Sequence, residues 1–162
     1  MLRFLSTFLA LVLPLAAQCS GNYPLGTVDT GLPARCSGLT GFIGPWVTFA
    51  GPVLATGNAS RVYWSDVPFD ANTGSILAVV GFDAMTLPAP VTIGGCASGW
   101  VGDGLANFGV VVDVVPGCQT ANVFTYQPDP ALAGFQFFGQ GYMLDVGNWA
   151  FSTSNAFQTT IL

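Results

Sequence analysis

The sequence has 162 residues, of which 7% are charged, and its formal net charge is −5. All of its acidic residues are aspartates and all of its basic residues are arginines, so lysine, histidine and glutamate are absent. These absences exclude a Ser/His/Asp or Cys/His nucleophile pair, a histidine-bound zinc, a Schiff base and a P-loop lysine. The negative net charge excludes a nucleic-acid partner. No cofactor is expected. The length of the chain predicts one folded domain.

Residues 1–17 have the pattern of a secretory signal peptide. Arg3 gives a basic start, Phe4–Leu15 is apolar, and small residues precede a cleavage site after Ala17. A membrane-spanning helix needs about 20 apolar residues, whereas this run is interrupted at Pro14. We therefore expect a protein that is secreted or held at the cell surface, with no membrane segment once the signal is cleaved.

Four cysteines follow the signal, at Cys19, Cys36, Cys96 and Cys118. An even count in an oxidising compartment indicates disulfides, and a metal site is not expected because there is no C-x-x-C pair and no histidine. Pairing neighbours along the chain, Cys19 with Cys36 and Cys96 with Cys118, closes the shortest loops and is the first expectation. Residues 18–43 are expected to form a loop region braced by such a bond. Other connectivities stay open.

Residues 44–162 are expected to form one antiparallel β-sandwich of jelly-roll or immunoglobulin-like type. Short runs rich in Val, Ile, Phe, Tyr and Trp alternate with clusters of Gly, Pro, Asn and Asp, and no stretch has the period of an amphipathic helix. Breaks include Gly51-Pro52, Pro88-Ala89-Pro90 and Pro128-Asp129-Pro130. About eight strands are predicted, at Trp46–Ala50, Ser60–Trp64, Ile76–Phe82, Val91–Gly95, Gly109–Val115, Asn122–Tyr126, Phe135–Asp145 and Ala156–Leu162.

Two of these strands also indicate which faces are buried. Ile76–Val80 is apolar at every position, which predicts a strand covered on both sides. In the strand from Phe135, the side chains of Phe135 and Phe137 share one face, and those of Gln136 and Gln140 share the other. One side of that strand is therefore expected in the core.

The aspartates suggest three kinds of site, and each has a simpler interpretation. Asp29-Thr30-Gly31 matches the aspartic-protease triplet, with Val79–Gly81 as a supporting element, but one copy would require a dimer, so a turn is preferred. Asp70–Gly74 resembles half of a calcium loop, but its glycine comes one residue early and no bidentate Glu follows, so a β-turn is preferred. Asp103 with Asn107 could contribute oxygen ligands to a different calcium geometry. No pair of aspartates is singled out for hydrolysis, and no catalytic residue is predicted.

The large aromatic residues are the best candidates for ligand contact. In a secreted sandwich, exposed Trp64, Trp100, Tyr142 and Trp149 could form a platform on which sugars stack. The competing interpretation, which we prefer, is that they fill the core. Trp100 and Trp149 adjoin glycine-rich or polar sequence and are expected to be the most exposed.

The end of the chain resembles a family of secreted bacterial β-domains that is abundant in planctomycetes. The resemblance lies at Asp129–Gln140 (DPALAGFQFFGQ), Leu144-Asp145 and Thr153–Ala156. Further matches are a Cys-x-Gly-x-x-Gly start at Cys36–Gly41, the aliphatic strand Ala78–Phe82 and the Gly95-Cys96 step. The likeness covers Cys36 to Leu162, but Thr159–Leu162 departs from the family's usual end near a glycine.

The resemblance implies a secreted module without established activity or ligand, often placed at the end of larger secreted proteins. Because Cys19 and Cys118 look additional to the family pattern, it also raises a rival pairing of Cys36 with Cys96 and Cys19 with Cys118. We expect a non-catalytic structural or binding module whose partner is a polysaccharide or another cell-surface protein. The alternatives are a carbohydrate-binding module and an Asp-dependent hydrolase.

Overall fold

The computed structural model describes residues 22–38, 43–65, 76–102, 106–112, 119–125 and 127–162. They form an antiparallel all-β sandwich, which confirms the expected fold class. The strands are β1 (Thr27–Asp29), β2 (Cys36–Ser37), β3 (Trp46–Phe49), β4 (Ala59–Ser65), β5 (Ile76–Asp83), β6 (Thr86–Ile93), β7 (Cys96–Val101), β8 (Ala106–Val112), β9 (Gln119–Thr125), β10 (Gln136–Asp145) and β11 (Ala150–Thr160). A 3-10 turn, η2 (Pro130–Leu132), precedes β10. The signal peptide expected at residues 1–17 lies outside the described residues.

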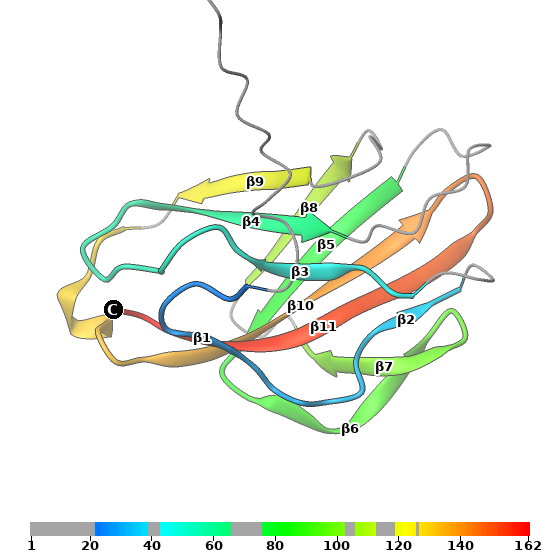
Figure 1. Cartoon of the computed structure of the whole chain (residues 1–162), viewed down its shortest axis with the longest axis horizontal. Helices are drawn as coiled ribbons and strands as arrows, with labels where there is room; N and C mark the ends of the chain where they lie inside the picture. The colour runs from blue at the N-terminus through cyan, green and yellow to red at the C-terminus, as the bar shows by residue number, and fades with distance from the viewer. Residues whose placement is uncertain (1–21, 39–42, 66–75, 103–105, 113–118, 126) are drawn as a thin grey trace, which may run out of the picture.

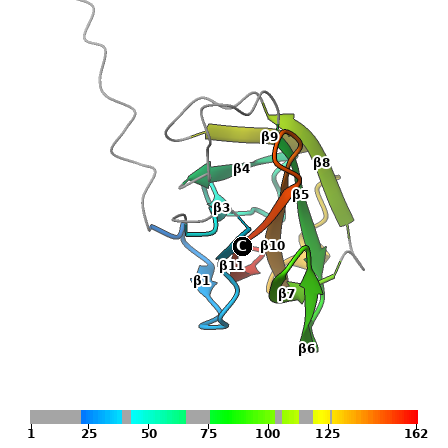
Figure 2. The same ribbon diagram turned by 90° about the vertical axis from the view of Figure 1, so that its right-hand side faces the viewer.

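The strands are arranged in three layers (Figure 1). A central sheet has the order β1-β11-β10-β5-β8, with β2 also pairing to β11. We call β3-β4-β9 the covering sheet and β6-β7 the outer hairpin. Figure 2 shows the covering sheet and the outer hairpin on different sides of the central sheet. The face of the central sheet that meets the covering sheet is its inner face, and the face that meets the hairpin is its outer face.

The hydrophobic core lies between the central and covering sheets. Its centre is a cluster of four rings, with centroids 5.6 to 6.4 Å apart, formed by Phe49, Phe82, Phe137 and Phe157. Gly141 of β10 faces the same layer, where an added Cβ would collide with the Trp64 ring. A glycine is therefore required there for the two sheets to approach. Of the two residues whose shared face was predicted to be buried, Phe137 lies in the core, whereas the prediction is wrong for Phe135, which precedes β10 and is 40% exposed.

Two departures from the predicted strands involve the outer hairpin. The Pro88-Ala89-Pro90 break lies within β6, where the β6–β7 register shifts between Thr86 and Val91. Proline lacks the donor that a ladder needs, but an irregular edge strand tolerates it. β7 was not predicted, because Cys96–Val101 contains the weak strand formers Ala, Ser and Gly. Gly94 and Gly95, both at positive φ, join the two strands.

Two further departures involve β11 and the first residues described. β11 begins at Ala150, whereas the strand was predicted from Ala156, because the polar run Ser152–Asn155 resembles a loop. These side chains are buried and hydrogen-bonded, so the strand continues through them. The loop expected over residues 18–43 contains β1 and β2, which pair with β11. These strands form because they pair with residues that are distant in the sequence, although the local sequence does not favour a strand.

The expectation that β5 is covered on both sides is wrong. Ala78 and Val80 face the core and are 0% and 3% exposed, whereas Leu77 and Val79 on the outer face are 43% and 37% exposed. The outer hairpin covers only part of that face, since Val79 lines an open groove beside it. β5 is nevertheless interior in the sheet, between β10 and β8.

Candidate functional site

The four aromatic residues named as candidates for a stacking platform do not form one, and for Trp64 the preferred interpretation, that it fills the core, is confirmed. Trp64 is 1% exposed within the core, so it is wrong as a ligand-stacking residue. Tyr142 lies on the opposite face of the central sheet, where its hydroxyl donates to the carbonyl oxygen of Val101. Trp100 is half-buried against a small apolar cluster that contains Val101. Its indole N–H is buried without a hydrogen-bond partner, so the expected exposure of Trp100 is wrong.

Trp149 is the exposed member of the set, as predicted. It lies in the turn between β10 and β11 and is 74% exposed. Its φ of 52° is in the left-handed region, which is unfavourable for a bulky side chain. Asp145 holds this turn by accepting from the amides of Gly147 and Asn148 at 2.9 and 3.1 Å. The turn therefore projects one indole ring away from the sandwich.

An apolar groove of about 380 Å³ lies between the outer hairpin and the outer face of the central sheet. β5 and β10 provide one wall and β6 and β7 provide the other. The lining residues are uncharged: Val79, Gly81, Leu87, Val91, Ile93, Gly99, Val101, Gly102 and Tyr142. Of these residues, Tyr142 was predicted from the sequence as a ligand contact, and the others were not. Leu87, Val91 and Ile93 of β6 were the available signal, but the predicted strand began at Val91, so the proline break concealed the part of β6 that carries Leu87.

A buried glutamine fixes the hairpin that forms the second wall. Gln140 of β10 is 0% exposed. Its Oε1 accepts from the amides of Trp100 and Val101 at 2.8 and 3.2 Å, and its Nε2 donates to the carbonyl oxygens of Ser98 and Ser154 at 2.8 and 3.0 Å. β6 pairs with the other edge of β7, for example at Gly99 opposite Val91. The edge of β7 that faces away from β6 is therefore satisfied by the Gln140 amide group.

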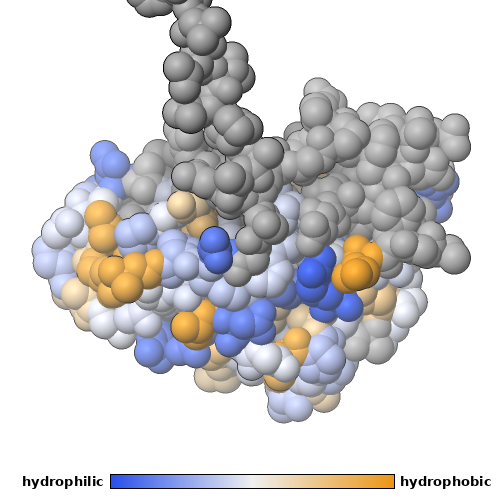
Figure 3. Space-filling view, viewed as in Figure 1, coloured by the Kyte–Doolittle hydropathy of each residue, from blue (hydrophilic) through white to orange (hydrophobic). Residues whose placement is uncertain are grey.

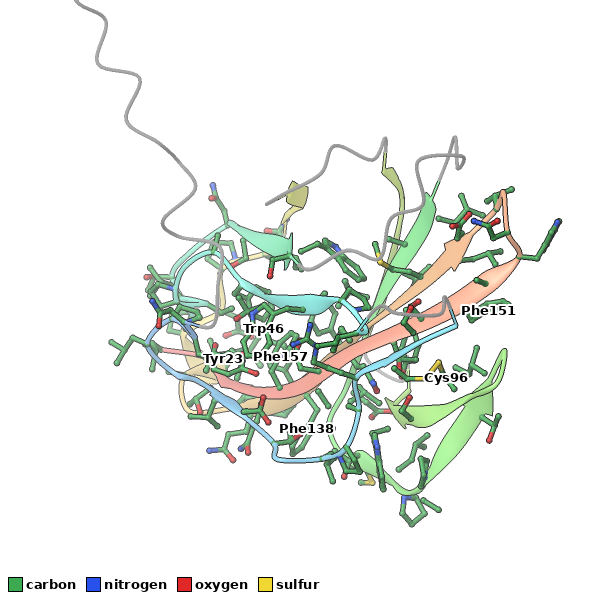
Figure 4. All side chains as sticks on the ribbon, turned by 45° about the vertical axis from the view of Figure 1, so that its right-hand side comes forward. Tyr23, Trp46, Cys96, Phe138, Phe151 and Phe157 are labelled. Atoms are coloured by element: carbon green, nitrogen blue, oxygen red, sulfur yellow. A yellow bond between two sulfur atoms is a disulfide. The ribbon has the colours of Figure 1, made fainter. Side chains whose placement is uncertain are left out.

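A disulfide fixes the other end of β7, and it corrects the first expectation about the cysteines. Cys36 of β2 bonds to Cys96 at the start of β7, across 60 residues of sequence. The pairing of Cys19 with Cys36 and of Cys96 with Cys118 is therefore wrong. Closing a short loop costs less entropy, which favours a bond between cysteines that are close in the sequence. In the folded protein, however, β2 pairs with β11 beneath the hairpin, and this pairing brings Cys36 next to Cys96. Cys19 and Cys118 lie outside the described residues. In Figure 4 the Cys96 sulfur lies near Phe151 of β11.

The protease-like triplet forms a turn at the end of β1, in agreement with the preferred interpretation. Asp29 Oδ1 accepts from the Gly31 amide at 2.6 Å, and its Oδ2 accepts from the Tyr23 hydroxyl at 2.6 Å. Asn155 donates to the same hydroxyl at 2.9 Å. Burial raises the pKa of the Tyr23 phenol, and Asp29 raises it further through its hydrogen bond and its charge. Figure 4 shows Tyr23 beside Trp46, where their ring centroids are 4.9 Å apart.

The other aspartates whose side chains are described also hold turns. Asp83 accepts from the Ala84 amide at 2.7 Å, and Asp129 caps η2 by accepting from Ala131 at 2.9 Å. Among the described residues no three Cys or Asp side chains gather as a metal site would require. The remaining aspartates, which include those of the suggested calcium sites, lie outside the described residues: Asp66, Asp70, Asp103 and Asp113.

A second apolar surface lies around the last described residues. Figure 3 shows apolar surface gathered at the end of the molecule where the chain terminates in Figure 1. Leu25 is 76% exposed, and Leu54, Leu132, Phe135 and Leu162 are between 40% and 43% exposed. The Leu162 amide bonds to Val53, next to Leu54. We call these five exposed residues the terminal patch.

Comparisons with known proteins do not assign the chain. No family model matches it, and neither does any curated protein or solved structure. In the part of the chain that the structure describes, no helix has the length and apolar character needed to cross a membrane.

Proposed function

We propose that this protein is a non-catalytic binding module that acts outside the cytoplasm, and that the groove holds an uncharged apolar group of its ligand. The observation that carries the proposal is the lining of the groove, which consists of aliphatic side chains, glycines and one tyrosine. The Tyr142 hydroxyl is already engaged by Val101 and by Gln140 Oε1. A charged ligand group would lose its hydration there without gaining a partner.

The size and rigidity of the groove support the same proposal. Small-molecule sites usually have volumes of about 300 to 1,000 Å³, and a cavity of about 150 Å³ can hold benzene. A volume of about 380 Å³ therefore suits one two-ring group or a short alkyl chain. The Gln140 hydrogen bonds and the Cys36–Cys96 disulfide hold the hairpin wall, so ligand binding requires little ordering of the protein.

The residue inventory supports the non-catalytic and extracytoplasmic parts of the proposal. The sequence lacks His, Lys and Glu, and each described aspartate accepts hydrogen bonds that hold a turn or bend. The signal-like residues 1–17 and a disulfide are typical of proteins that fold in an oxidising compartment.

A titration with indole, a neutral two-ring probe, tests the groove. We expect saturable chemical-shift changes in NMR spectra at groove residues of β5, β7 and β10. Val79→Asp places a carboxylate in one wall and should weaken binding at least about tenfold, because a bound apolar probe would cover the charge and remove part of its hydration without giving it a partner. Val28→Asp is the matched control, because Val28 is exposed on β1 and does not line the groove. Shifts spread over the whole protein, or equal losses in both variants, would contradict the proposal.

A second candidate function is carbohydrate binding, and it rests on Trp149. An indole that is 74% exposed at a turn with an unfavourable φ is available to stack on a sugar ring. A glycan array with the intact protein tests this candidate. Hits that disappear with Trp149→Ala would support it, and an array without hits, or with hits that this variant retains, would eliminate it.

A further inference from the structure

The strand edges of this sandwich are protected in several ways. An unprotected edge presents free backbone N–H and C=O groups that can pair with another chain. β1 and β2 have only 3 and 2 residues, and β6 carries Pro88 and Pro90. The free edge of β7 is satisfied by Gln140. The free edge of β3 is satisfied in the same way by Asn155, which accepts from the Val47 amide at 2.7 Å and donates to the Val47 carbonyl at 2.9 Å.

Two longer strands, β8 and β9, are the remaining sheet edges among the described residues. The β4–β9 ladder shifts register between Arg61 and Val62, and such an irregularity bends an edge away from regular pairing. The β5–β8 ladder has no shift from Phe82↔Ala106 to Ile76↔Val112. Among the described residues, the opposite edge of β8 has no hydrogen-bonded strand, although β9 lies close to part of β8, so this edge presents a regular row of backbone groups. Figure 2 shows β8 outside β5, at the margin of the central sheet.

We propose that β8 pairs with β8 of a second copy of this chain, in antiparallel orientation, and so continues the central sheet across a two-fold axis. Gly109 is the middle residue of β8. An axis at Gly109 pairs Ala106 of one copy with Val112 of the other along the full strand. A glycine inside a strand often marks a close approach of another backbone.

A second copy fits this edge better than an unrelated strand for two reasons. A two-fold axis makes an antiparallel strand complementary to itself, so both backbone rows are matched in register and length. The chain has a net charge of −5, which repels other copies, but Ala106–Val112 contains no charged residue and no proline. The uncharged strand therefore offers a place where two copies can approach.

The first measurement is the mass of the intact mature protein in solution by light scattering. A single strand pair is a small interface, so we expect the mass to rise from that of one chain toward twice that value between about 5 µM and 500 µM. Gly109→Lys should abolish this rise, because lysine on an edge strand opposes pairing. Gly109 lies opposite the outer-face residue Val79, so the new side chain adds to the outer face and not to the core. Thr92→Lys on exposed β6 is the matched control and should dimerise as the parent does.

The second measurement does not depend on Gly109→Lys folding. Residues that face each other across an antiparallel pair have Cα atoms about 4.5 to 5.5 Å apart, which is within disulfide range. Gly109→Cys should therefore form a disulfide-linked dimer under mild oxidation, identified by mass spectrometry of the linked peptide, and Thr92→Cys should not. A single-chain mass at all concentrations, equal cross-linking of both variants, or a dimer that Gly109→Lys leaves intact would overturn the proposal. A dimer that Gly109→Lys leaves intact would show that the two copies bind through another surface, such as the terminal patch.

Discussion

The two faces of the central sheet are held to their neighbours by different forces. The inner face meets the covering sheet through packed rings and aliphatic side chains, including Phe49 and Phe157 at 1% and 0% exposure. The outer face meets the hairpin through hydrogen bonds, a disulfide and one small apolar cluster around Val101. β6 is mostly exposed, so the hairpin buries too little apolar surface to be held by packing alone. The outer hairpin, which forms one wall of the groove, is therefore held in place mainly by hydrogen bonds and a disulfide.

The two faces nevertheless share one device. Gln140 on the outer face and Asn155 on the inner face each use a side-chain amide to bind a backbone N–H and a backbone C=O of a strand edge. An amide side chain has both a donor and an acceptor, as a peptide group has, so it can take the place of a neighbouring strand. On the inner face, the Asn155 hydrogen bonds add to the stability that the large core provides. On the outer face, the Gln140 hydrogen bonds are one of the main interactions that hold the hairpin.

The largest expected effect is on the inner face. Phe49→Ala should lower the free energy of unfolding by about 4 kcal/mol, because it removes a ring at the centre of the cluster and leaves a cavity. Urea denaturation measures the change. Phe135→Ala is the control, because Phe135 is 40% exposed and its loss should have a much smaller effect. Equal losses in the two variants would show that the ring cluster does not dominate stability.

Removal of the disulfide should affect the outer face first. The double variant Cys36→Ser and Cys96→Ser should lose about 3 kcal/mol, because the cross-link restricts the unfolded chain. Hydrogen exchange should become faster in β6 and β7 while the amides of β3 and β4 stay protected. A uniform loss of protection would contradict the separate anchoring of the two faces.

Loss of the buried amide should cost about 2 kcal/mol. Gln140→Leu leaves the amide of Trp100 and the carbonyl of Ser98 buried without partners, and each unsatisfied group is costly. Gln136→Leu is the matched control on the same strand, because Gln136 is exposed and its contacts lie at the surface. Denaturation of both variants makes the comparison. Similar stability of the two would show that the hairpin does not need Gln140.

The smallest expected effect concerns Tyr23 and depends on pH. The raised pKa of Tyr23 in the folded protein means that the folded state keeps this proton more tightly than the unfolded state. The resulting stabilisation is complete below the unfolded pKa of about 10 and decreases as the pH rises above it. The urea midpoint of the parent should therefore fall more steeply above pH 10 than that of Tyr23→Phe. Parallel curves for the two proteins would contradict this assignment.

Much of the fold could be predicted because its signals are local. Alternating apolar residues and turn clusters located most of the long strands, and Asp29 was correctly interpreted as part of a turn. The predictions failed where pairing overrides local preference, as at Pro88 and Pro90 in β6 and in the polar run of β11. The candidate site was less predictable, because the groove combines the consecutive strands β5, β6 and β7 with β10, which lies far along the sequence and pairs with β5 only in the folded protein.

The sequence by itself determined the class of protein: an all-β chain with turn-forming aspartates and without histidine, lysine or glutamate. Composition and alternation are properties of neighbouring residues, so they can be recognised before the chain folds. The tertiary structure alone decided between the two cysteine pairings in favour of Cys36 with Cys96, separated the half-buried Trp100 from the exposed Trp149, and showed that Gln140 completes a strand edge. Each of these depends on which strands become neighbours and which face each side chain then occupies, and long-range pairing sets both.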